Sequence, residues 1–488
     1  MSTAPLDPHR PVAHLRPPMN WINDPNGLVF HDGHYHVCYQ YNPHGATHAN
    51  MHWGHFRSPD LISWEPLPLA LAPTTGGVDA DGCFSGNAVS DGDRMVAFYS
   101  AYRQESPQHQ PVTTATSHDG GRTFTPRGQL LIPEVPEGCT MYRDPYVWQH
   151  GAGWRMLVGA AFADGRGAAL LYDSPDLETW TYRGPFTARE KQGVGDAGQH
   201  TGEGWECPQY LSATDGPSAL IFSAWNDDDS PRCVAALVGE ERGDTFEAGP
   251  PVLVDHGPDC YAPALLRAPG KRRLLWGWSR EARDEAWTVA DGWAGVLTVP
   301  RETWVGDDGS LRQQPAAELL ALRGERTLHA TGETHGPDAV ELGSVGRAID
   351  LMARLETTGA AGLRLLTTAD GDEFLDIRFD AARGELVVDR DHASLDSRAQ
   401  RGSYRMPCPS DRPIELRVVV DHSIAEIFLT TTGQVLTLRF YPTGDGPWRL
   451  EAHSAPGTRL DYAVDAWQLH PLVIKEPGAA AASSESTP

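Results

Sequence analysis

The sequence is poor in lysine and lacks long apolar runs. Only three of its 488 residues are lysine, at positions 191, 271 and 475, and 65 acidic residues against 40 basic ones leave a net charge of −25. Such a charge argues against partners that are themselves anionic, so we expect no nucleic acid and no membrane surface. It is compatible with a protein that acts on a neutral small molecule.

Paired cysteines and metal-binding motifs are also missing. Seven cysteines (38, 83, 139, 207, 233, 260 and 408) are widely spaced without a CxxC pair, which predicts reduced thiols rather than disulfides or a zinc site. No Asp-x-Asp-x-Asp loop or histidine pair at ligand spacing occurs, so we expect no metal and no cofactor. The N-terminal segment MSTAPLDPHRPVAHLRPP has no apolar stretch, and no run approaches the ~18 residues of a membrane span. We therefore expect a cytoplasmic protein.

What the sequence does contain is turn-forming and aromatic residues. Fifty glycines and 39 prolines, with 15 Trp, 14 Tyr and 13 Phe, favour many short strands joined by turns. Residues 34–41 alternate, with Tyr35, Val37, Tyr39 and Tyr41 on one face of a predicted strand. Similar strands continue to about residue 310 without an amphipathic helix. The predicted fold class is all-β.

Two series of residues repeat at nearly the same interval. A Ser-x-Asp turn followed by an aromatic residue occurs with its aspartate at 60, 119 and 176, which are 59 and 57 residues apart. A second series consists of Asp24, Ser85, Asp144, Glu206 and Cys260, at intervals of 61, 59, 62 and 54 residues. Repeats of about four short strands are typical of propeller blades. The alternative is chance spacing in a glycine-rich β protein.

These patterns predict four segments. Residues 1–314 are expected to form a five-bladed β-propeller, with the second series on its innermost strands. Residues 315–333 contain the helix-prone Pro-Ala-Ala-Glu-Leu-Leu-Ala-Leu-Arg and are predicted to be a short helical linker. Residues 334–472 read as hairpins of a C-terminal β-sandwich, and residues 473–488 as a disordered tail.

Three acids are the candidates for chemistry. Asp24 lies in Asn-Asp-Pro-Asn-Gly, Asp144 in Tyr-Arg-Asp-Pro-Tyr and Glu206 in Trp-Glu-Cys-Pro. Asp-Pro-Asn-Gly alone is typical of a surface turn. Each acid, however, has aromatic neighbours that would bury it, and burial and like charges separate the pKa values of neighbouring acids. One acid that stays ionised and one that keeps a proton are what glycoside hydrolysis requires.

A set of motifs resembles glycoside hydrolase family 32. They are Asn-Trp-Ile-Asn-Asp-Pro-Asn-Gly (20–27), Gln-Tyr-Asn-Pro (40–43), Trp-Gly-His (53–55), Phe-Ser-Gly (84–86), Arg-Asp-Pro (143–145) and Glu-Cys-Pro (206–208). They occur in the family's order, and the match extends to residue 301. Ile22 replaces the usual Met. Cys260-Tyr261 departs from the usual Phe-Tyr, which leaves the pocket rim and the leaving-group preference open.

The resemblance implies a retaining enzyme that cleaves terminal β-D-fructofuranosides, most simply sucrose to glucose and fructose, through a covalent fructosyl-aspartate. It implies that Asp24 is the nucleophile, Glu206 the general acid/base and Asp144 the transition-state stabiliser. We expect Asp24 to stay ionised through Asn23 and backbone donors, and Glu206 to be protonated more easily. The expected substrate-binding residues are Trp21, Asn23, Gln40, Trp53, Phe84, Ser85, Arg143 and Trp278.

Other interpretations remain open at this point. Sucrose-6-phosphate hydrolase and exo-fructanase activity (on levan or inulin) fit the same motifs, while a non-catalytic sugar-binding propeller would keep the aromatic residues without needing three acids. The Ser-x-Asp-Gly-Gly-x-Thr-Phe turn at 117–124 looks like a sialidase turn, but a sialidase also needs an arginine cluster and a tyrosine nucleophile. A further family match, Asp421-x-Ser423-x-x-Glu426, is interpreted as hairpin-stabilising. The expected partner is a small saccharide, and the oligomeric state stays open.

Overall fold

The protein is almost entirely β-strand. The computed structural model describes residues 7–195, 198–213, 216–226, 232–336, 338–444 and 446–475. In this part of the chain the helices are α1 (Glu285–Asp291) and the 3-10 helices η1 (Pro269–Lys271) and η2 (Ala317–Leu322). No helix among the described residues is long and apolar enough to cross a membrane. The prediction of an all-β protein is confirmed.

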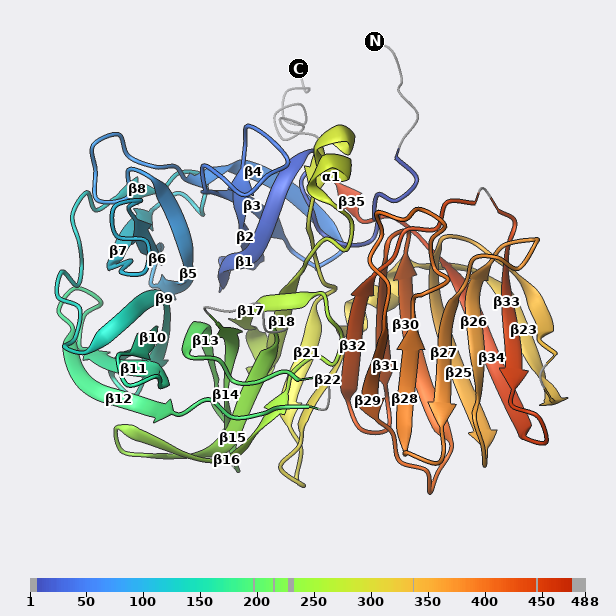
Figure 1. Ribbon diagram of the computed structural model, residues 1–488. Coiled ribbons are helices and arrows are strands. Elements are labelled where there is room, and N and C mark those ends of the chain that lie inside the picture. Colours follow the sequence, from blue (N-terminus) through green and yellow to red (C-terminus); the bar gives the residue numbers. More distant parts are fainter. Residues whose placement is uncertain are drawn as a thin grey trace, which may run out of the picture.

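Within the described residues, five sheets follow one another along the first two thirds of the chain (Figure 1). The first contains β1 (Asn20–His31), β2 (His34–Asn42), β3 (His52–Ser58) and β4 (Ser63–Leu71), with β19 (Trp293–Ala294) and β35 (Val473–Ile474) at its edges. The second contains β5 (Gly82–Asp91), β6 (Arg94–Tyr102), β7 (Val112–Ser117) and β8 (Thr125–Pro126). The third contains β9 (Cys139–His150), β10 (Gly153–Phe162), β11 (Gly167–Ser174) and β12 (Thr181–Arg189). The fourth contains β13 (Gly204–Leu211), β14 (Ser218–Trp225), β15 (Val234–Arg242) and β16 (Thr245–Leu253). The fifth contains β17 (Cys260–Arg267), β18 (Arg273–Ser279), β20 (Val296–Leu297), β21 (Arg301–Val305) and β22 (Leu311–Pro315).

The first strands of these sheets form a closed ring of contacts. Strand β1 contacts β5, β5 contacts β9, β9 contacts β13, β13 contacts β17, and β17 returns to β1. The second repeat series lies on these five strands, one residue on each: Asp24, Ser85, Asp144, Glu206 and Cys260. The side chains of Asp24, Ser85, Asp144 and Glu206 come together where these strands approach one another, whereas the Cys260 thiol lies beside Asp255 instead.

The repeated turn has the same hydrogen bonds at each site. Asp60, Asp119 and Asp176 each accept from the serine two residues earlier, over 3.1, 2.9 and 3.3 Å. Their Oδ1 atoms also accept backbone N–H groups that follow in the turn. Such Asx turns close each loop locally. The residue after the aspartate adopts positive φ at all three sites, at Leu61, Gly120 and Leu177.

The last third of the described chain packs as two six-stranded sheets, on the right in Figure 1. One has the order β23 (Arg323–His335), β34 (Arg459–Leu469), β25 (Ala348–Thr357), β30 (Ile414–Asp421), β31 (Ile424–Leu429) and β32 (Gln434–Arg439). The other has the order β24 (Val340–Val345), β33 (Trp448–Ser454), β26 (Ala361–Thr367), β27 (Leu375–Asp380), β28 (Glu385–Asp389) and β29 (Ser403–Pro407). Alternate apolar residues from both sheets, such as Leu351, Leu363, Ile377 and Val418, form one buried core.

Two sequence expectations differ from the structure. The predicted helical linker is helical only over Ala317–Leu322, because residues from Arg323 onward pair with β34 and extend the sheet. The expected tail begins too early, since Val473–Ile474 pair in parallel with Ser63–Trp64 of β4. The rest of that expected tail, residues 476–488, lies outside the described residues.

Buried ions join the sandwich to the first part of the chain. Asp421 accepts from the backbone N–H groups of Val12, Ala13 and His14 and from His14 Nδ1, while Glu426 lies 3.1 Å from His14 Nε2. Glu426 also accepts from Arg301. The Asp421 motif was expected to stabilise its own hairpin. Its carboxylates instead contact residues 12–14 and Arg301, which lie outside the sandwich. The motif therefore stabilises the interface between the sandwich and the first part of the chain.

Candidate active site

A local irregularity occurs at the same place in all five inner strands. The pairing register shifts between Ile22 and Pro25 in β1 and between Cys83 and Gly86 in β5, and equivalent shifts span Asp144 in β9, Cys207 in β13 and Ala262 in β17. Bulges of this kind turn a side chain away from the regular pleat and are common beside active sites. The prolines at 25, 145, 208 and 263 suit these positions, because they have no N–H to donate to the sheet.

Asp24 is buried and held by side-chain donors. Its Oδ2 accepts from the Ser85 hydroxyl at 2.5 Å, and its Oδ1 accepts from Asn23 Nδ2 at 3.1 Å. The Trp21 indole N–H donates to Asn23 Oδ1 at 2.8 Å and fixes the orientation of that amide. The expected Asn23 contact is present, and a serine hydroxyl takes the place of the expected backbone donors.

Asp144 lies beside Asp24 and shares a neighbour with it. Its Oδ2 accepts from the Cys207 backbone N–H and from Arg143 Nε, both at 3.0 Å. The Cys207 sulfur is 3.6 Å from Oδ2 of Asp24 and 3.6 Å from Oδ2 of Asp144. Burial and the three nearby carboxylates raise the pKa of Cys207, so its thiol keeps the proton that it donates. Asp144 and Cys207 both have positive φ, at 62° and 49°, which places them at the bulges.

Glu206 is connected to the same cluster through Arg143. Its Oε1 lies 3.1 Å from Arg143 Nη1, and its Oε2 accepts from the Tyr261 hydroxyl at 2.8 Å. The Tyr261 hydroxyl is also 3.0 Å from the carbonyl oxygen of Ala224. The three predicted acids therefore lie together, joined by one guanidinium group and one thiol.

Burial changes the protonation of the predicted nucleophile. It raises the pKa of Asp24 to about 6, and the charges of Asp144 and Glu206 add to this, while Ser85 and Asn23 lower it. Burial alone would lower the pKa of Arg143, but Asp144 and Glu206 outweigh it and raise the pKa, so the guanidinium stays charged. The expectation that donors such as Asn23 keep Asp24 ionised therefore applies above about pH 6, and below it Asp24 gains its proton.

The predicted aromatic residues surround this cluster. The Trp21 and Trp278 rings meet edge to face at 5.7 Å, and the Phe84 ring stacks on Tyr102 at 4.1 Å with the Arg143 guanidinium carbon 5.7 Å from its centre. Trp53 is fully buried and donates to the Phe84 carbonyl oxygen at 3.2 Å. A sugar ring could contact the faces of Trp21, Trp278 and Phe84, whereas Trp53 acts by positioning Phe84.

Gln40 supports the same strand. Its Nε2 donates to the Cys83 carbonyl oxygen at 3.0 Å, which fixes the backbone before Ser85. Its Oε1 is buried and has no hydrogen-bond partner among the described residues. A buried acceptor of this kind is a suitable partner for a substrate hydroxyl.

Several neighbours of the acids were not found from the sequence. Ser100 accepts from the Asp144 backbone N–H at 2.7 Å, and His48 lies edge-on to both Trp21 and Phe84. A cavity of about 580 Å³ opens beside Phe84 and His48. Ser100 and His48 lie outside every sequence motif, because each comes from a strand or loop beside the inner strand that carries the acid.

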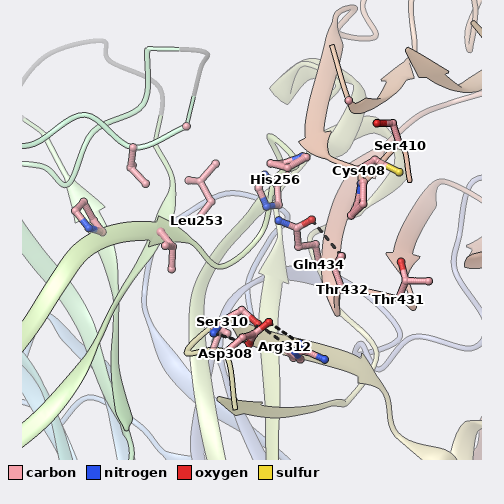
Figure 2. Close-up of a pocket in the computed structure, with 18 of the residues that line it drawn as sticks. Leu253, His256, Asp308, Ser310, Arg312, Cys408, Ser410, Thr431, Thr432 and Gln434 are labelled. Atoms are coloured by element: carbon pink, nitrogen blue, oxygen red, sulfur yellow. Dashed lines mark hydrogen bonds and ion pairs between the residues drawn. The ribbon is translucent and has the colours of Figure 1, made fainter. Parts of the chain in front are cut away.

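A larger cleft lies elsewhere. It has a volume of about 910 Å³ and lies between the outer strand β16, the β21–β22 turn and the sandwich (Figure 2). Leu253, His256, Arg312, Cys408 and Gln434 are among its lining residues, and none of the three acids contributes to it. We assign the chemistry to the acid cluster, because the cleft lacks paired carboxylates. Among the described residues, no group of three or more His, Cys, Asp or Glu side chains is arranged to hold a metal ion.

Comparison with known proteins gives a consistent result over the whole chain. Residues 14–315 match the model of the glycosyl hydrolases family 32 N-terminal domain, and residues 318–468 match that of the family 32 C-terminal domain. The chain is 31% identical to the raffinose invertase of Escherichia coli, over 94% of this chain and 95% of that protein. It is 28% identical to the sucrose-6-phosphate hydrolase of Bacillus subtilis (strain 168), over 95% of each.

The fold is also that of solved structures. Fructan 1-exohydrolase IIa from Cichorium intybus superimposes with a TM-score of 0.84 at 24% identity, covering 96% of this chain and 98% of that one. A Bombyx mori β-fructofuranosidase in complex with sucrose gives a TM-score of 0.78 at 25% identity, covering 96% and 95%.

Proposed function

The chain belongs to glycoside hydrolase family 32 and is a β-fructofuranosidase-type glycosyl hydrolase, and from that premise we propose that it hydrolyses sucrose to glucose and fructose. One observation carries this proposal. Asp24, Asp144 and Glu206 come from three different sheets and are joined through Arg143 and Cys207 in one buried cluster, beside aromatic faces. A protein that only binds sugars has no need for three buried carboxylates held in this way.

We assign the nucleophile to Asp24. Its carboxylate attacks the anomeric carbon C2 of the fructosyl unit, the bond from C2 to the glycosidic oxygen breaks, and a fructosyl ester on Asp24 forms. Water then attacks C2, fructose leaves and the Asp24 carboxylate is restored. Two displacements retain configuration, so β-fructose is the first product. Ser85 and Asn23 hold the two oxygens of Asp24 and leave it in one orientation for the attack.

We assign the proton transfer to Glu206. It protonates the departing glucose oxygen in the first step and removes a proton from water in the second. Its contact with Tyr261 supports this role. A tyrosine hydroxyl has one proton, and the Ala224 carbonyl can only accept. Tyr261 can donate to Glu206 while that carboxyl is ionised and to Ala224 while it is protonated, so the contact is kept in both states that the two steps require.

We assign Asp144 to the fructose hydroxyls. Arg143 and the Cys207 N–H hold its Oδ2, and Ser100 holds its backbone. A carboxylate fixed in this way can accept hydrogen bonds from hydroxyls of the fructosyl unit. These hydrogen bonds become stronger as positive charge develops on the sugar ring during the reaction at C2. Gln40, Phe84, Trp21 and Trp278 complete the proposed pocket, and the buried Trp53 positions Phe84.

We also infer that the five sheets are the blades of a propeller. The closed ring of contacts among β1, β5, β9, β13 and β17 supports this, as does the repeated Ser-x-Asp turn. The proposed propeller extends from β1 to β22. The sandwich begins at β23, and its hairpins do not supply a catalytic acid.

Sucrose 6-phosphate is a second candidate substrate, favoured by a group of cations at the site. The guanidinium carbons of Arg232 and Arg280 lie 5.7 and 6.0 Å from the centre of the Tyr261 ring, which contacts Glu206. Arg280 is also 6.0 Å from the Trp278 ring. Guanidinium groups bind phosphate well, so a phosphorylated glucose would find donors next to the proton donor.

A substrate panel tests the proposed function. The wild-type protein is incubated with sucrose, sucrose 6-phosphate, levan and inulin, and the released fructose is measured, with Asp24→Ala as the matched inactive control. We expect free fructose from sucrose and its first appearance as the β-anomer by NMR. Preference for the phosphate ester or for a fructan would reassign the substrate. No fructose from any of the four would contradict the proposed function.

A further inference from the structure

Glu281 connects the sandwich to one side of the proposed active site, formed by the Trp21 and Trp278 rings and called here the Trp21–Trp278 wall. It lies three residues after Trp278, and its side chain is buried, with 8% of its surface exposed. Its Oε1 accepts from the backbone N–H of Gly295 at 2.8 Å and from Arg439 Nη1 at 3.1 Å. Its Oε2 accepts from Arg283 Nε at 2.8 Å and from the Tyr441 hydroxyl at 2.6 Å. Arg439 and Tyr441 come from the end of the β31–β32 hairpin of the sandwich.

Gly295, one of the four donors, lies directly against the nucleophile strand. It has φ of +79°, and a Cβ at this position would be 2.1 Å from the Ile22 carbonyl oxygen and 3.0 Å from Trp278 Nε1. The two residues before it pair in parallel with Asn20 and Trp21 of β1. The carbonyl oxygen that it approaches belongs to the residue two positions before Asp24. A shift of Gly295 would therefore move Trp21, Trp278 and the start of the Asn23–Asp24 segment.

The sandwich side of this contact is rigid. Arg439 is fully buried, and its Nε and Nη2 donate to the carbonyl oxygen and the hydroxyl of Ser423, both at 2.9 Å. The backbone N–H of Arg439 donates to Asp259 at 2.8 Å. Tyr441 is also fully buried. Glu281 is thus held by side chains that have few other positions available, which makes it able to transmit the placement of the sandwich.

We propose that Glu281 is a positioning residue for the reaction, through which Arg439 and Tyr441 of the sandwich set the Trp21–Trp278 wall and the approach of β1 to Asp24. This inference rests on the proposed function of the acid cluster. It assigns to the C-terminal sandwich a part in substrate binding without contact between the sandwich and the substrate. The four hydrogen-bond donors of Glu281 described above include no residue of the acid cluster, so we assign it a positioning role rather than a catalytic one.

The expected effect is on substrate binding more than on the chemical step. The tryptophan wall contacts the sugar before and during the reaction alike, and loss of such uniform binding raises KM while kcat changes little. Glu281→Gln keeps the shape of the side chain but removes the charge that Arg439 and Arg283 share. We expect KM for sucrose to rise about tenfold, with kcat within about threefold of wild type. Tyr441→Phe, which removes a single hydroxyl, should raise KM in the same direction by a smaller factor.

Glu426→Gln is the matched control. Glu426 is also a buried acid at the same interface and also binds an arginine, Arg301, but its contacts lead to His14 and Val299 rather than to Gly295. The three variants and the wild type are compared by thermal unfolding and by steady-state kinetics on sucrose at 25 °C, well below unfolding. We expect Glu281→Gln and Glu426→Gln to lower the Tm, and only Glu281→Gln and Tyr441→Phe to raise KM.

Each outcome bears on the inference. If Glu281→Gln and Tyr441→Phe keep the wild-type KM, Glu281 does not position the site. If Glu426→Gln raises KM equally, the effect is general loosening of the interface and the inference is also wrong. If Glu281→Gln fails to fold, the KM values of Tyr441→Phe and Glu426→Gln are compared instead. A raised KM in Tyr441→Phe alone supports the inference, and any other result contradicts it. A wild-type protein that releases no fructose contradicts the proposed function itself. An active wild type whose variants keep the wild-type KM contradicts only the role given to Glu281.

Discussion

The Ser85 hydroxyl donates a hydrogen bond of 2.5 Å to Oδ2 of Asp24, from the first strand of the next sheet. This bond stabilises the ionised carboxylate and opposes the effect of burial, which raises the pKa of Asp24 to about 6. Ser85 and Asp24 occupy equivalent positions in neighbouring repeats, so the spacing of the repeat brings the hydroxyl to the carboxylate. The hydrogen bond thereby widens the pH range in which the proposed nucleophile is ionised.

Removal of that hydroxyl should move the acid side of the pH profile. In Ser85→Ala the ionised form of Asp24 loses a donor, so its pKa rises further and the acid limb of kcat/KM shifts to higher pH. A hydrogen bond to a charged group contributes about 1.5 kcal/mol, which corresponds to a shift of about one pH unit. The measurement is kcat/KM on sucrose from pH 4 to 9. Ser100→Ala, which removes a hydroxyl beside Asp144 instead, is the control and should leave this limb near pH 6. A limb that stays in place in Ser85→Ala would contradict the role given to the bond.

The histidine at the interface should make stability depend on pH. Burial alone would lower the pKa of His14, but Asp421 and Glu426 outweigh it and raise the pKa to about 9. A raised folded-state pKa means that the contribution is fully present below about pH 6.5 and is lost as the pH rises through about 9. The total contribution of this shift to the free energy of unfolding is about 3 kcal/mol. Wild-type Tm should therefore fall between pH 7 and 10, measured by scanning calorimetry.

His14→Gln should be less stable than the wild type at pH 7 and should show a flatter decline of Tm with pH. Equal slopes in wild type and His14→Gln would show that His14 is not the group responsible.

The two arginines beside Tyr261 give a prediction about substrate preference. In the proposed pocket Arg280, beside the Tyr261 and Trp278 rings, would contact the phosphate of sucrose 6-phosphate, whereas sucrose offers it no charge. Arg280→Gln should lower kcat/KM for the phosphate ester by about tenfold or more and for sucrose by much less, because a charge-assisted hydrogen bond contributes about 1.5–3 kcal/mol. The ratio of the two kcat/KM values is the measurement. An unchanged ratio would mean that Arg280 does not take part in the choice between these substrates.

The acid motifs and the Ser-x-Asp turns could be predicted from the sequence, because both depend on local sequence pattern. Asp24, Asp144 and Glu206 each lie in a short proline-bounded motif, and their regular spacing predicted their place on the first strands of three of the five sheets. The Ser-x-Asp turns were predictable for the same reason, because their hydrogen bonds close within a few residues.

Contacts between distant segments were not predictable in this way. The Tyr261 hydroxyl reaches Glu206 from another sheet, and Asp421 reaches residues 12–14 across the interface, so neither contact leaves a local pattern. Residues from Arg323 to 333 follow a helix-prone stretch, yet they are strand because pairing with β34 outweighs local propensity. The raised pKa of Asp24 depends on burial and on two acids that are 120 and 182 residues away in the chain.

Loss of the proposed proton donor Glu206 and loss of the proposed nucleophile Asp24 should differ in how they depend on the leaving group. Glu206→Ala is assayed with sucrose and with a fructoside whose leaving group needs no proton, across pH 4 to 10, with Asp24→Ala as the control. Loss of the proton donor should lower the rate on sucrose by roughly 10²–10⁴-fold, with much less loss on the activated fructoside. On that substrate the acid limb of kcat/KM near pH 6, set by Asp24, should stay, and Asp24→Ala should be inactive on both. An equal loss of rate on the two substrates in Glu206→Ala, or an Asp24→Ala variant that still hydrolyses the activated fructoside, would contradict these assignments.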